Sequence, residues 1–266
     1  MIKVVIVGAA GRMGLSLARC CPREPSLRLV GAVERADHPQ MGQDLGRLAG
    51  GAEIGLWLSS DLRAAAPHAD VLIDFSIHQG VPATVALAAT LSKAVVIGTT
   101  GLDAAEADAV RQHAARIPIV WSPNMSLGMN VLFALVRKAA AALGLAYDIE
   151  IVESHHHFKK DAPSGTALRL AEEAAAGRNQ QLKDVAVYGR HGLGPERPRG
   201  EIGIHAVRGG DIVGDHTVYF ATEGERLELT HRVSSRDALA MGALHAAAWV
   251  SGRAPGLYGM QDVLGL

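Results

Sequence analysis

Side chains able to bind an anion and to move a proton are concentrated in one short stretch of the sequence. Three consecutive histidines begin at His155, and two lysines, Lys159 and Lys160, follow after one intervening residue. The turn Pro-Ser-Gly-Thr-Ala at 163–167 comes next, where Ser164 can cap a helix and leave its first backbone N–H groups facing outward. Imidazole, ammonium groups and a helix N-terminus attract an anion, and a histidine also exchanges protons near neutral pH. The stretch therefore predicts a site for a small substrate that carries carboxylates.

Two other interpretations of this stretch compete with the anion site. A metal site would use His155 and His157, which fall on one side if the preceding strand continues through them. Two neighbouring ammonium groups would oppose a cation, however, and no further cluster of ligands is evident. A charged surface segment without a ligand is a poor explanation, because the Pro-Ser-Gly-Thr turn fixes the end of this segment. We therefore expect an anion site and no metal.

A second candidate site is a glycine turn that directly follows an apolar strand at residues 2–7. Glycines stand at every third position from Gly8 to Gly14. Without side chains, the backbone can come close to a pyrophosphate, which the N–H groups at the start of the following helix would bind. The spacing differs from the standard Gly-x-Gly-x-x-Gly, and a tight turn without a ligand is the alternative. Glu34 lies twenty residues beyond the turn, where an acid can accept hydrogen bonds from an adenosine ribose. Arg35 can pair with a 2′-phosphate, so we predict a nicotinamide dinucleotide site for NADH or NADPH.

Two further loops follow apolar strands of the same half of the chain. One is Gly-Thr-Thr-Gly at 98–101, and the other is Ser-Pro-Asn-Met at 122–125. Ligands of open parallel sheets sit at the carboxyl ends of the strands, so both loops are placed to line the nicotinamide end of a cofactor. Taken alone, each would be an ordinary turn.

The helices and strands that must hold these loops follow two different sequence patterns. In the first, nearly continuous apolar strands alternate with helical patterns, which predicts a doubly wound, Rossmann-like parallel sheet ending near residue 126. In the second, turn signals separate polar-patterned strands, which predicts an α+β domain. The expected strands are 2–7, 27–33, 70–75, 94–97, 117–121, 147–153, 203–208, 217–222 and 226–232. The expected helices are 14–21, 82–90, 102–115, 127–143, 167–176 and 235–249, with polar loops at 155–166 and 189–200.

Composition narrows the class of protein. The chain has 266 residues, of which 48% are hydrophobic and 20% charged, and this excludes a disordered chain. The net charge of −1 gives no general reason to expect a nucleic acid or an anionic membrane as partner. The two cysteines, Cys20 and Cys21, are adjacent, so we expect them to be reduced and packed as small apolar residues. With no leader sequence and no apolar run approaching about 20 residues, we expect a cytoplasmic protein.

Five sequence blocks, in order along essentially the whole chain, resemble the dihydrodipicolinate reductase (4-hydroxy-tetrahydrodipicolinate reductase) family. The most specific block is Glu-Ile-x-Glu-x-His-x-x-x-Lys-x-Asp-x-Pro-Ser-Gly-Thr-Ala, which begins at Glu150. The others are the glycine turn, the Gly-Thr-Thr-Gly loop, the segment 208–217 and the segment 228–236. The positions of His157 and Phe158 vary in the family.

The resemblance implies roles for particular residues. His155 matches the proton donor and Lys159 the catalytic lysine, while His156 matches a substrate contact. Gly165 and Thr166 match the loop that holds a substrate carboxylate. The matching cofactor contacts are Gly8, Ala9, Ala10, Gly11, Arg12, Met13, Glu34, Arg35, Gly98, Thr99, Thr100, Ser122, Pro123, Asn124 and Met125.

The resemblance also implies an activity and an organisation. Hydride transfer from NADH or NADPH would reduce a dicarboxylate ring to tetrahydrodipicolinate in lysine and diaminopimelate biosynthesis. Residues 1–126 and 235–266 would form the dinucleotide-binding domain, and residues 127–234 a substrate domain that assembles homotetramers. Two alternatives remain, another dehydrogenase of the same architecture and a non-catalytic NAD(P) sensor. The presence of both His155 and Lys159 argues against them.

Overall fold

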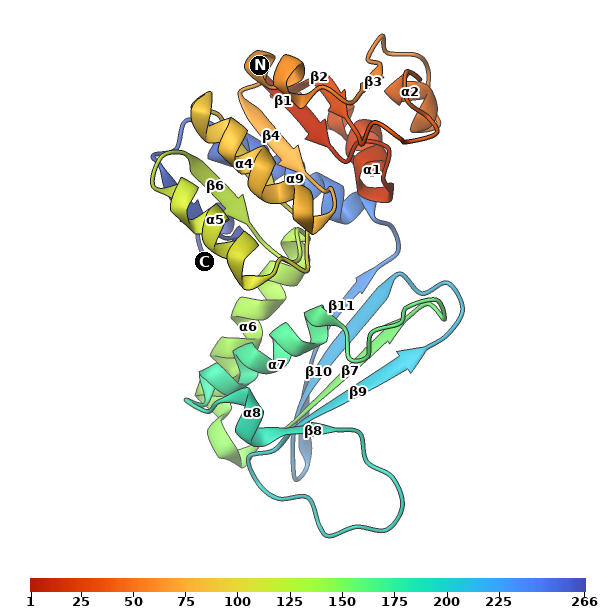
Figure 1. Cartoon of the computed structure of the whole chain (residues 1–266). Coiled ribbons are helices and arrows are strands. Elements are labelled where there is room, and N and C mark those ends of the chain that lie inside the picture. Colours follow the sequence, from red (N-terminus) through yellow and green to blue (C-terminus); the bar gives the residue numbers. More distant parts are fainter. The chain divides into compact units, whose positions relative to one another are not determined.

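A computed structural model describes all 266 residues, and the chain forms two compact units (Figure 1). The first unit contains residues 1–127 and 236–266, and the second contains residues 128–235. The last part of the chain thus returns to the unit in which the chain begins. That the first unit binds the cofactor and the second binds the substrate stays a prediction.

The first unit is built on a seven-stranded sheet in which all neighbouring strands pair in parallel. Its strand order is β12-β6-β5-β4-β1-β2-β3, with β1 at the point where the order reverses. The strands are β1 (Ile2–Val7), β2 (Leu27–Val33), β3 (Leu58–Ser59), β4 (Val71–Asp74), β5 (Ala94–Ile97), β6 (Pro118–Trp121) and β12 (Gly256–Tyr258). This confirms the predicted doubly wound sheet.

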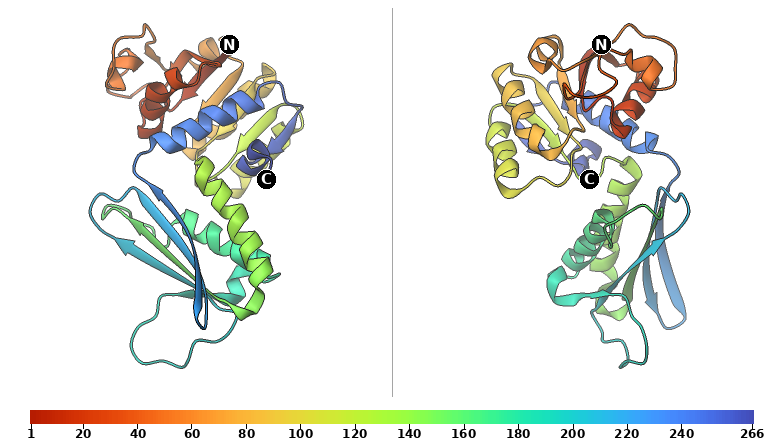
Figure 2. Two further views of the ribbon diagram at one scale, coloured as in Figure 1. Left: turned by 180° about the vertical axis from the view of Figure 1, so that it is seen from behind. Right: turned by 45° about the vertical axis from the view of Figure 1, so that its right-hand side comes forward.

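Helices cover both faces of that sheet, which explains why its strands are apolar throughout. On one face, Val4 and Ile6 of β1 pack with helices α1 and α9, and on the other Val5 packs with α4 and α5 (Figure 2). The helices of this unit are α1 (Arg12–Cys20), α2 (Leu45–Leu48), α3 (Leu62–Ala65), α4 (Val81–Thr90), α5 (Ala104–Ala114), α9 (Asp237–Val250) and α10 (Met260–Leu264). Both cysteines are free and buried in this core, as predicted.

The second unit is a mixed sheet of five strands with helices on one face, which confirms the predicted α+β architecture (Figure 2). The order is β11-β10-β7-β9-β8, where β10 is antiparallel to both neighbours and β9 is parallel to both of its own. The strands are β7 (Asp148–His155), β8 (Ala186–Tyr188), β9 (Ile202–Arg208), β10 (Gly214–Thr222) and β11 (Glu225–Val233). The helices are α6 (Leu127–Leu143), α7 (Gly165–Gly177) and α8 (Leu182–Val185).

The structure corrects the expected bounds at two chemically relevant places. Strand β7 continues to His155, because Ser154 pairs with Asp215 of β10 and His155 pairs with Arg208 of β9. Backbone pairing on both sides thus overrides the polar side chains that predicted a loop. Helix α1 begins at Arg12, two residues earlier than expected. The short elements β3, β8, β12, α2, α3, α8 and α10 were too short to show a periodicity.

Helix α6 differs from the expectation that no apolar run approaches about 20 residues. The stretch 127–146 is long and apolar enough to cross a membrane by length and composition, although a core helix of a soluble protein passes the same test. Met129, Phe133 and Val136 of this helix are buried against β7 and β10 in the core of the second unit. Packing within its unit therefore explains the buried face of α6, whereas Val131 and Leu135 of the same helix are exposed.

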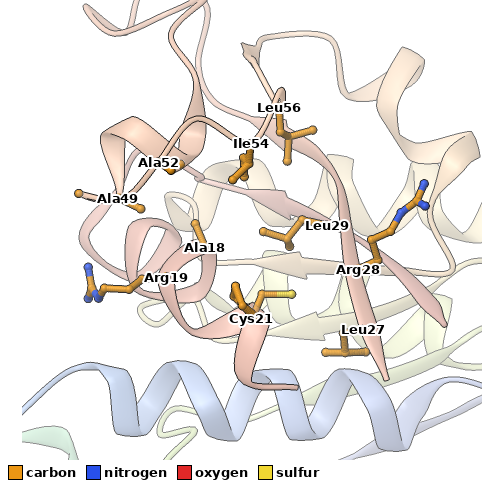
Figure 3. A pocket seen from close by; sticks show the side chains of 14 residues that line it. Ala18, Arg19, Cys21, Leu27, Arg28, Leu29, Ala49, Ala52, Ile54 and Leu56 are labelled. Atoms are coloured by element: carbon orange, nitrogen blue, oxygen red, sulfur yellow. The ribbon is translucent and has the colours of Figure 1, made fainter. Parts of the chain in front are cut away.

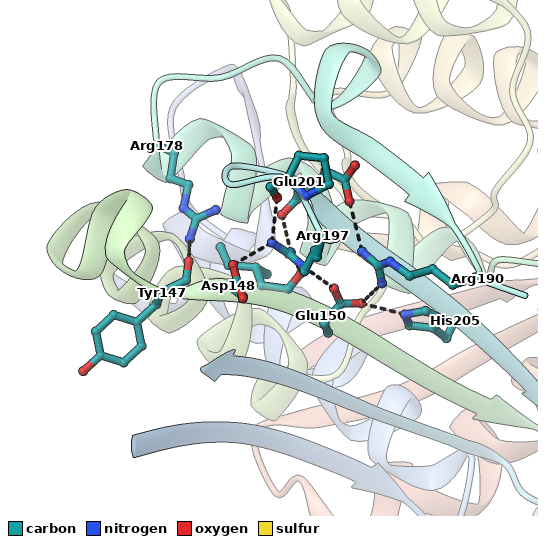
Figure 4. Close-up of polar contacts among 10 residues, drawn as sticks. Tyr147, Asp148, Glu150, Arg178, Arg190, Arg197, Glu201 and His205 are labelled. Atoms are coloured by element: carbon teal, nitrogen blue, oxygen red, sulfur yellow. Dashed lines mark hydrogen bonds and ion pairs between the residues drawn. The ribbon is translucent and has the colours of Figure 1, made fainter. Parts of the chain in front are cut away.

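The segment between β8 and β9 is the predicted loop, and ion pairs hold it to the sheet (Figure 4). Arg190 and Arg197 donate to the carboxylate of Glu150 on β7 at 2.9 and 2.8 Å, and His205 of β9 lies 2.7 Å from it. Because residues alternate along a strand, Glu150 lies on the opposite face of the sheet from Ile149 and Ile151, which are in the core.

Candidate active site

The glycine turn places the start of α1 at the carboxyl end of β1. A side chain on Gly14 would put its Cβ 2.3 Å from the carbonyl oxygen of Gly8, so the turn closes only with glycine there. Gly8 itself adopts a φ of +80°, in the left-handed region. Gly11 is the N-cap and supplies no side-chain hydrogen bond to the first turn of α1. The first amide groups of the helix are therefore available to an anion such as a pyrophosphate.

Glu34 is brought to this turn, as the spacing predicts. It follows the end of β2, and its Oε2 accepts a hydrogen bond from the backbone N–H of Ala10 at 3.2 Å. The neighbouring Arg35 is exposed, and its guanidinium lies 3.5 Å from Asp37. A carboxylate beside the glycine turn and an exposed guanidinium next to it fit a dinucleotide with or without a 2′-phosphate.

The Gly-Thr-Thr-Gly loop is tied to the neighbouring strand by a residue that the sequence reasoning missed. Asp74, the last residue of β4, is fully buried, and its Oδ1 accepts hydrogen bonds from the hydroxyls of Thr99 and Ser76 at 3.1 and 2.6 Å. Burial raises the pKa of Asp74 against these hydrogen bonds, which lower it. Thr99 is thus a buried link, whereas Thr100 is exposed at the carboxyl edge of the sheet. The sequence signal that could have identified Asp74 is an acidic residue at the end of an apolar strand.

The loop 122–125 is held by its own hydrogen bonds. Ser122 is buried and donates its hydroxyl to the carbonyl oxygen of Asn124 at 2.9 Å, and Pro123 is exposed. The side chain of Met125 is buried in the core of the first unit. Ala9 is buried in the same core, whereas Met13 is half-buried. The side chains of Met125 and Ala9 therefore serve packing.

In the second unit, His155 is held by a buried carboxylate. Its Nδ1 lies 2.5 Å from Oε2 of Glu153, which lies two residues earlier on the same face of β7 and is 0% exposed. Arg208 donates to both carboxylate oxygens at 2.8 Å, and the backbone N–H of Ser164 donates to Oε1 at 2.9 Å. Burial alone would raise the pKa of Glu153, but the hydrogen bonds from His155, Arg208 and Ser164 outweigh it and lower the pKa to about 2. Glu153 is therefore an anion at any physiological pH.

A second buried histidine, also missed from the sequence, packs against the first. The ring of His216 on β10 meets the ring of His155 edge-on, with centroids 5.2 Å apart. Its Nε2 lies 3.2 Å from the hydroxyl of Ser164, which in turn accepts a hydrogen bond from the Ala167 N–H and so caps α7. Burial, with His155 as the next cause, lowers the pKa of His216 to about 3, so its ring is neutral at physiological pH.

The remaining predicted substrate residues lie beside this pair. Lys159 is paired with Asp161 at 2.9 Å, and its charge contributes to the lowered pKa of His216. Gly165 and Thr166 are the first residues of α7, where the backbone N–H groups have no intrahelical acceptor. His156, the first residue after β7, is half-buried. The structure therefore gathers a histidine, an ammonium group and a helix N-terminus in one unit.

The metal alternative loses its geometric premise. Strand β7 ends at His155, so His157 does not continue the strand and does not share its face. The ring of His157 is exposed, and its Nδ1 lies 3.0 Å from the carbonyl oxygen of Gly210. No three His, Cys, Asp or Glu side chains of the chain are grouped as ligands for a metal ion.

A cavity of about 460 Å³ lies elsewhere in the first unit (Figure 3). Its walls come from the end of α1, the start of β2 and the segment 46–56, with apolar side chains such as Leu29 and Leu56. Cys21 contributes a thiol whose pKa is raised to about 11 by burial. The glycine turn lies at the other ends of α1 and β2, so this cavity is separate from the predicted cofactor site.

The fold of the chain is similar to that of a probable dehydrogenase from Thermotoga maritima, with a TM-score of 0.62. That likeness covers 98% of this chain and 92% of the other at 12% identity, and it concerns the fold alone.

The particular family is shown by closer matches, and the chain belongs to the dihydrodipicolinate reductase family. The model of the family's N-terminal part matches residues 2–125, and that of its C-terminal part matches residues 128–264. The chain is 52% identical to the 4-hydroxy-tetrahydrodipicolinate reductase of Anaeromyxobacter dehalogenans over all of this chain and 98% of that one. It is 47% identical to the enzyme of that name from Syntrophus aciditrophicus, over all of this chain and 99% of that one.

A solved structure agrees with this assignment. The dipicolinate-bound dihydrodipicolinate reductase from Paenisporosarcina sp. TG-14 matches with a TM-score of 0.77 and 25% identity, over 98% of this chain and 99% of that one. The family predicted from the sequence blocks is therefore confirmed.

Proposed function

We propose that the protein reduces 4-hydroxy-tetrahydrodipicolinate to tetrahydrodipicolinate with NADH or NADPH, as a step of lysine and diaminopimelate biosynthesis. The observation that carries the proposal is full-length identity of about half to reductases of that name. The chain also holds a glycine turn with Glu34 beside it and a buried His155 held by the carboxylate of Glu153. These groups suit a dinucleotide and a small dicarboxylate, respectively.

The first unit would hold the cofactor and the second the substrate. The open first turn of α1 would bind the pyrophosphate, and Glu34 would accept hydrogen bonds from the ribose. When bound, the reduced nicotinamide supplies a hydride. The loops 98–101 and 122–125 follow β5 and β6 at the carboxyl edge of the same sheet, which is where ligands of such sheets lie.

The residues of the second unit would bind the carboxylates and supply the proton. The ammonium group of Lys159 and the first amides of α7, at Gly165 and Thr166, would hold the two carboxylates of the ring. His155 would protonate the ring carbon that becomes basic when hydride adds to the neighbouring carbon. The 4-hydroxyl leaves as water before the hydride adds or together with it, so one hydride and one proton are consumed and one water is released for each ring.

The test is a spectrophotometric assay of the purified chain with the freshly made condensation product of aspartate semialdehyde and pyruvate. We expect loss of NADPH and of NADH that depends on this substrate. Binding of NADPH without turnover would favour a sensor. Turnover of a different aldehyde or alcohol alone would favour another dehydrogenase.

The choice between the two cofactors is predicted to depend on Arg35. Its guanidinium is exposed next to Glu34, where it can pair with a 2′-phosphate. Arg35→Ala should weaken NADPH binding more than NADH binding, by about 1–3 kcal/mol for a lost charged hydrogen bond. Dissociation constants for both cofactors, measured by titration, give the comparison. Equal losses would remove Arg35 from the phosphate-binding role.

We propose further that the protein is a homotetramer assembled through the second unit. Helices α6 and α7 lie on one face of its sheet, and no helix of this unit covers the other face (Figure 2). That face carries Tyr219 and the 47%-exposed Val207. Sedimentation at micromolar concentration should give four times the chain mass. A monomer under those conditions would contradict the assembly.

The expected place of action is the cytoplasm. Both cysteines are unpaired and buried, which suits a reducing compartment. The relatives are named reductases of 4-hydroxy-tetrahydrodipicolinate, a small polar molecule. We expect no nucleic acid and no membrane among the partners.

A further inference from the structure

Stability alone explains poorly the ion pair of the buried Glu153 with the half-buried Arg208. A carboxylate taken out of water costs several kcal/mol, and replacing a buried ion pair by apolar residues is often neutral or stabilising. The site lies at the end of β7 and β9, and its Glu153 is fully buried beside the apolar core. A carboxylate retained in such a place needs a role that an apolar side chain cannot fill.

All hydrogen-bonding positions of this carboxylate are in use. Oε1 accepts from Nη2 of Arg208 and from the Ser164 N–H, and Oε2 accepts from Nη1 of Arg208 and from Nδ1 of His155. Arg208 also donates to the carbonyl oxygen of Asp161 at 2.6 Å, so its own position is fixed from the loop side. The carboxylate therefore has one orientation, and the imidazole of His155 is held by it.

The contact determines which nitrogen of His155 carries a proton. An ionised carboxylate only accepts hydrogen bonds, so Nδ1 of the ring must be the donor in the 2.5 Å contact with Glu153. Nε2 is then left for the other partner. It lies toward Gly214, the first residue of β10, where an added Cβ would come within 3.2 Å of Nε2. The glycine keeps that side of the ring open.

We propose that Glu153 is a positioning residue for His155: its carboxylate holds the imidazole through Nδ1 and leaves Nε2 as the nitrogen that delivers the proton. Arg208 and the Ser164 amide act through Glu153 by fixing its orientation. The proposal rests on the proposed function, because it concerns the proton donor of that reaction. It adds a requirement that the reaction alone does not impose, namely that His155 works only with a carboxylate behind it.

The central test is a double-mutant cycle. In Glu153→Gln the amide N–H₂ would face Nδ1, since the amide oxygen is claimed by Arg208 and Ser164, and the ring would be held in the wrong tautomer. We expect kcat to fall about 10²-fold. In a His155→Gln background the same substitution should change kcat less than about threefold, because the residue acts through His155. A merely structural Glu153 would lower kcat equally in both backgrounds, and that result would overturn the proposal.

A second variant guards against loss of folding. Glu153→Gln leaves Arg208 without its carboxylate, so the pair Glu153→Gln/Arg208→Met removes both charges together. We expect this variant to fold, as judged by circular dichroism and an unchanged Kd for NADPH, and to remain about 10²-fold slow. Recovery of kcat in the charge-free pair would show that only the unpaired arginine mattered and would refute the positioning role.

The matched control is Glu150→Gln on the same strand. Glu150 is also an arginine-paired carboxylate, but it lies on the other face of the sheet among Arg190, Arg197 and His205 (Figure 4). We expect its kcat to stay within about threefold of the parent, since no contact joins it to His155. If His155→Gln is slow and Glu153→Gln is not, the positioning role alone fails. If His155→Gln is itself fully active, or the parent chain does not reduce the substrate, the proposed function fails.

Discussion

Replacing His155 by glutamine should lower kcat by about 10²–10⁴-fold, the usual contribution of a positioned general acid. The residue is buried at the end of β7, and its Nδ1 is engaged by Glu153, so Nε2 is the only nitrogen left for the substrate. Binding of NADPH should change little, because the predicted cofactor residues belong to the other unit. Steady-state rates and a fluorescence titration with NADPH measure the two quantities separately.

Two neighbouring residues make this prediction specific. Lys159→Ala should lower kcat and also raise KM, because an ammonium group beside a dicarboxylate contributes to binding as well as to catalysis. His157→Gln should stay within a few-fold of the parent, since its ring is exposed and contacts the carbonyl oxygen of Gly210 and the ring of Phe158. Loss of activity in His157→Gln with a mild His155→Gln would show that the functional register of the loop is wrong. The metal alternative would then be tested by titration with a chelator.

The layout of the fold could be predicted because its signals are local. Apolar runs, a glycine turn and helical periodicity lie within short windows, and the five principal strands of the first unit were placed within a residue or two. The glycine turn and Glu34 were found through spacing, and the structure joins them by the Ala10 N–H. Which sheet the last helix covers is a non-local matter that periodicity does not address. The resemblance supplied that expectation.

The support of the candidate site could not be predicted in the same way. Arg208 is separated from Glu153 by 55 residues, and His216 from Ser164 by 52. Both residues stand inside sequence blocks that resemble the family, but a block identifies residues without showing which atoms meet. His155 was assigned to a loop because its neighbours are polar, whereas backbone pairing with Arg208 of β9 places it in a strand. Contacts between distant segments decided these features.

Lowering the pH should destabilise the second unit through His216 before the carboxylates titrate. Burial lowers the pKa of His216 from 6.5 to about 3, so below pH 6.5 the unfolded chain binds a proton that the folded chain does not. The free energy of unfolding therefore falls as the pH falls from 6.5 toward 3, by about 1.4 kcal/mol per unit. Glu153, whose pKa is lowered from 4.5 to about 2, acts in the same direction only below pH 4.5. Between pH 6.5 and 4.5 we expect His216 to contribute a loss of about 2 kcal/mol.

The chain offers an internal control for this measurement, because its three tryptophans, Trp57, Trp121 and Trp249, all belong to the first unit. Urea unfolding followed by far-ultraviolet circular dichroism reports on both units, while tryptophan fluorescence reports on the first. At fixed protein concentration, the transition of the second unit should move to lower urea between pH 6.5 and 4.5 more than the fluorescence transition does. His216→Gln can keep a hydrogen bond to Ser164 without titrating, so it should remove most of the difference. His231, whose pKa burial also lowers, should contribute a slope of the same sign. If the pH dependence of the second transition is unchanged in His216→Gln, His216 is not the group whose protonation opposes folding. Glutamine does not titrate, so loss of the imidazole would then have had no effect on proton uptake.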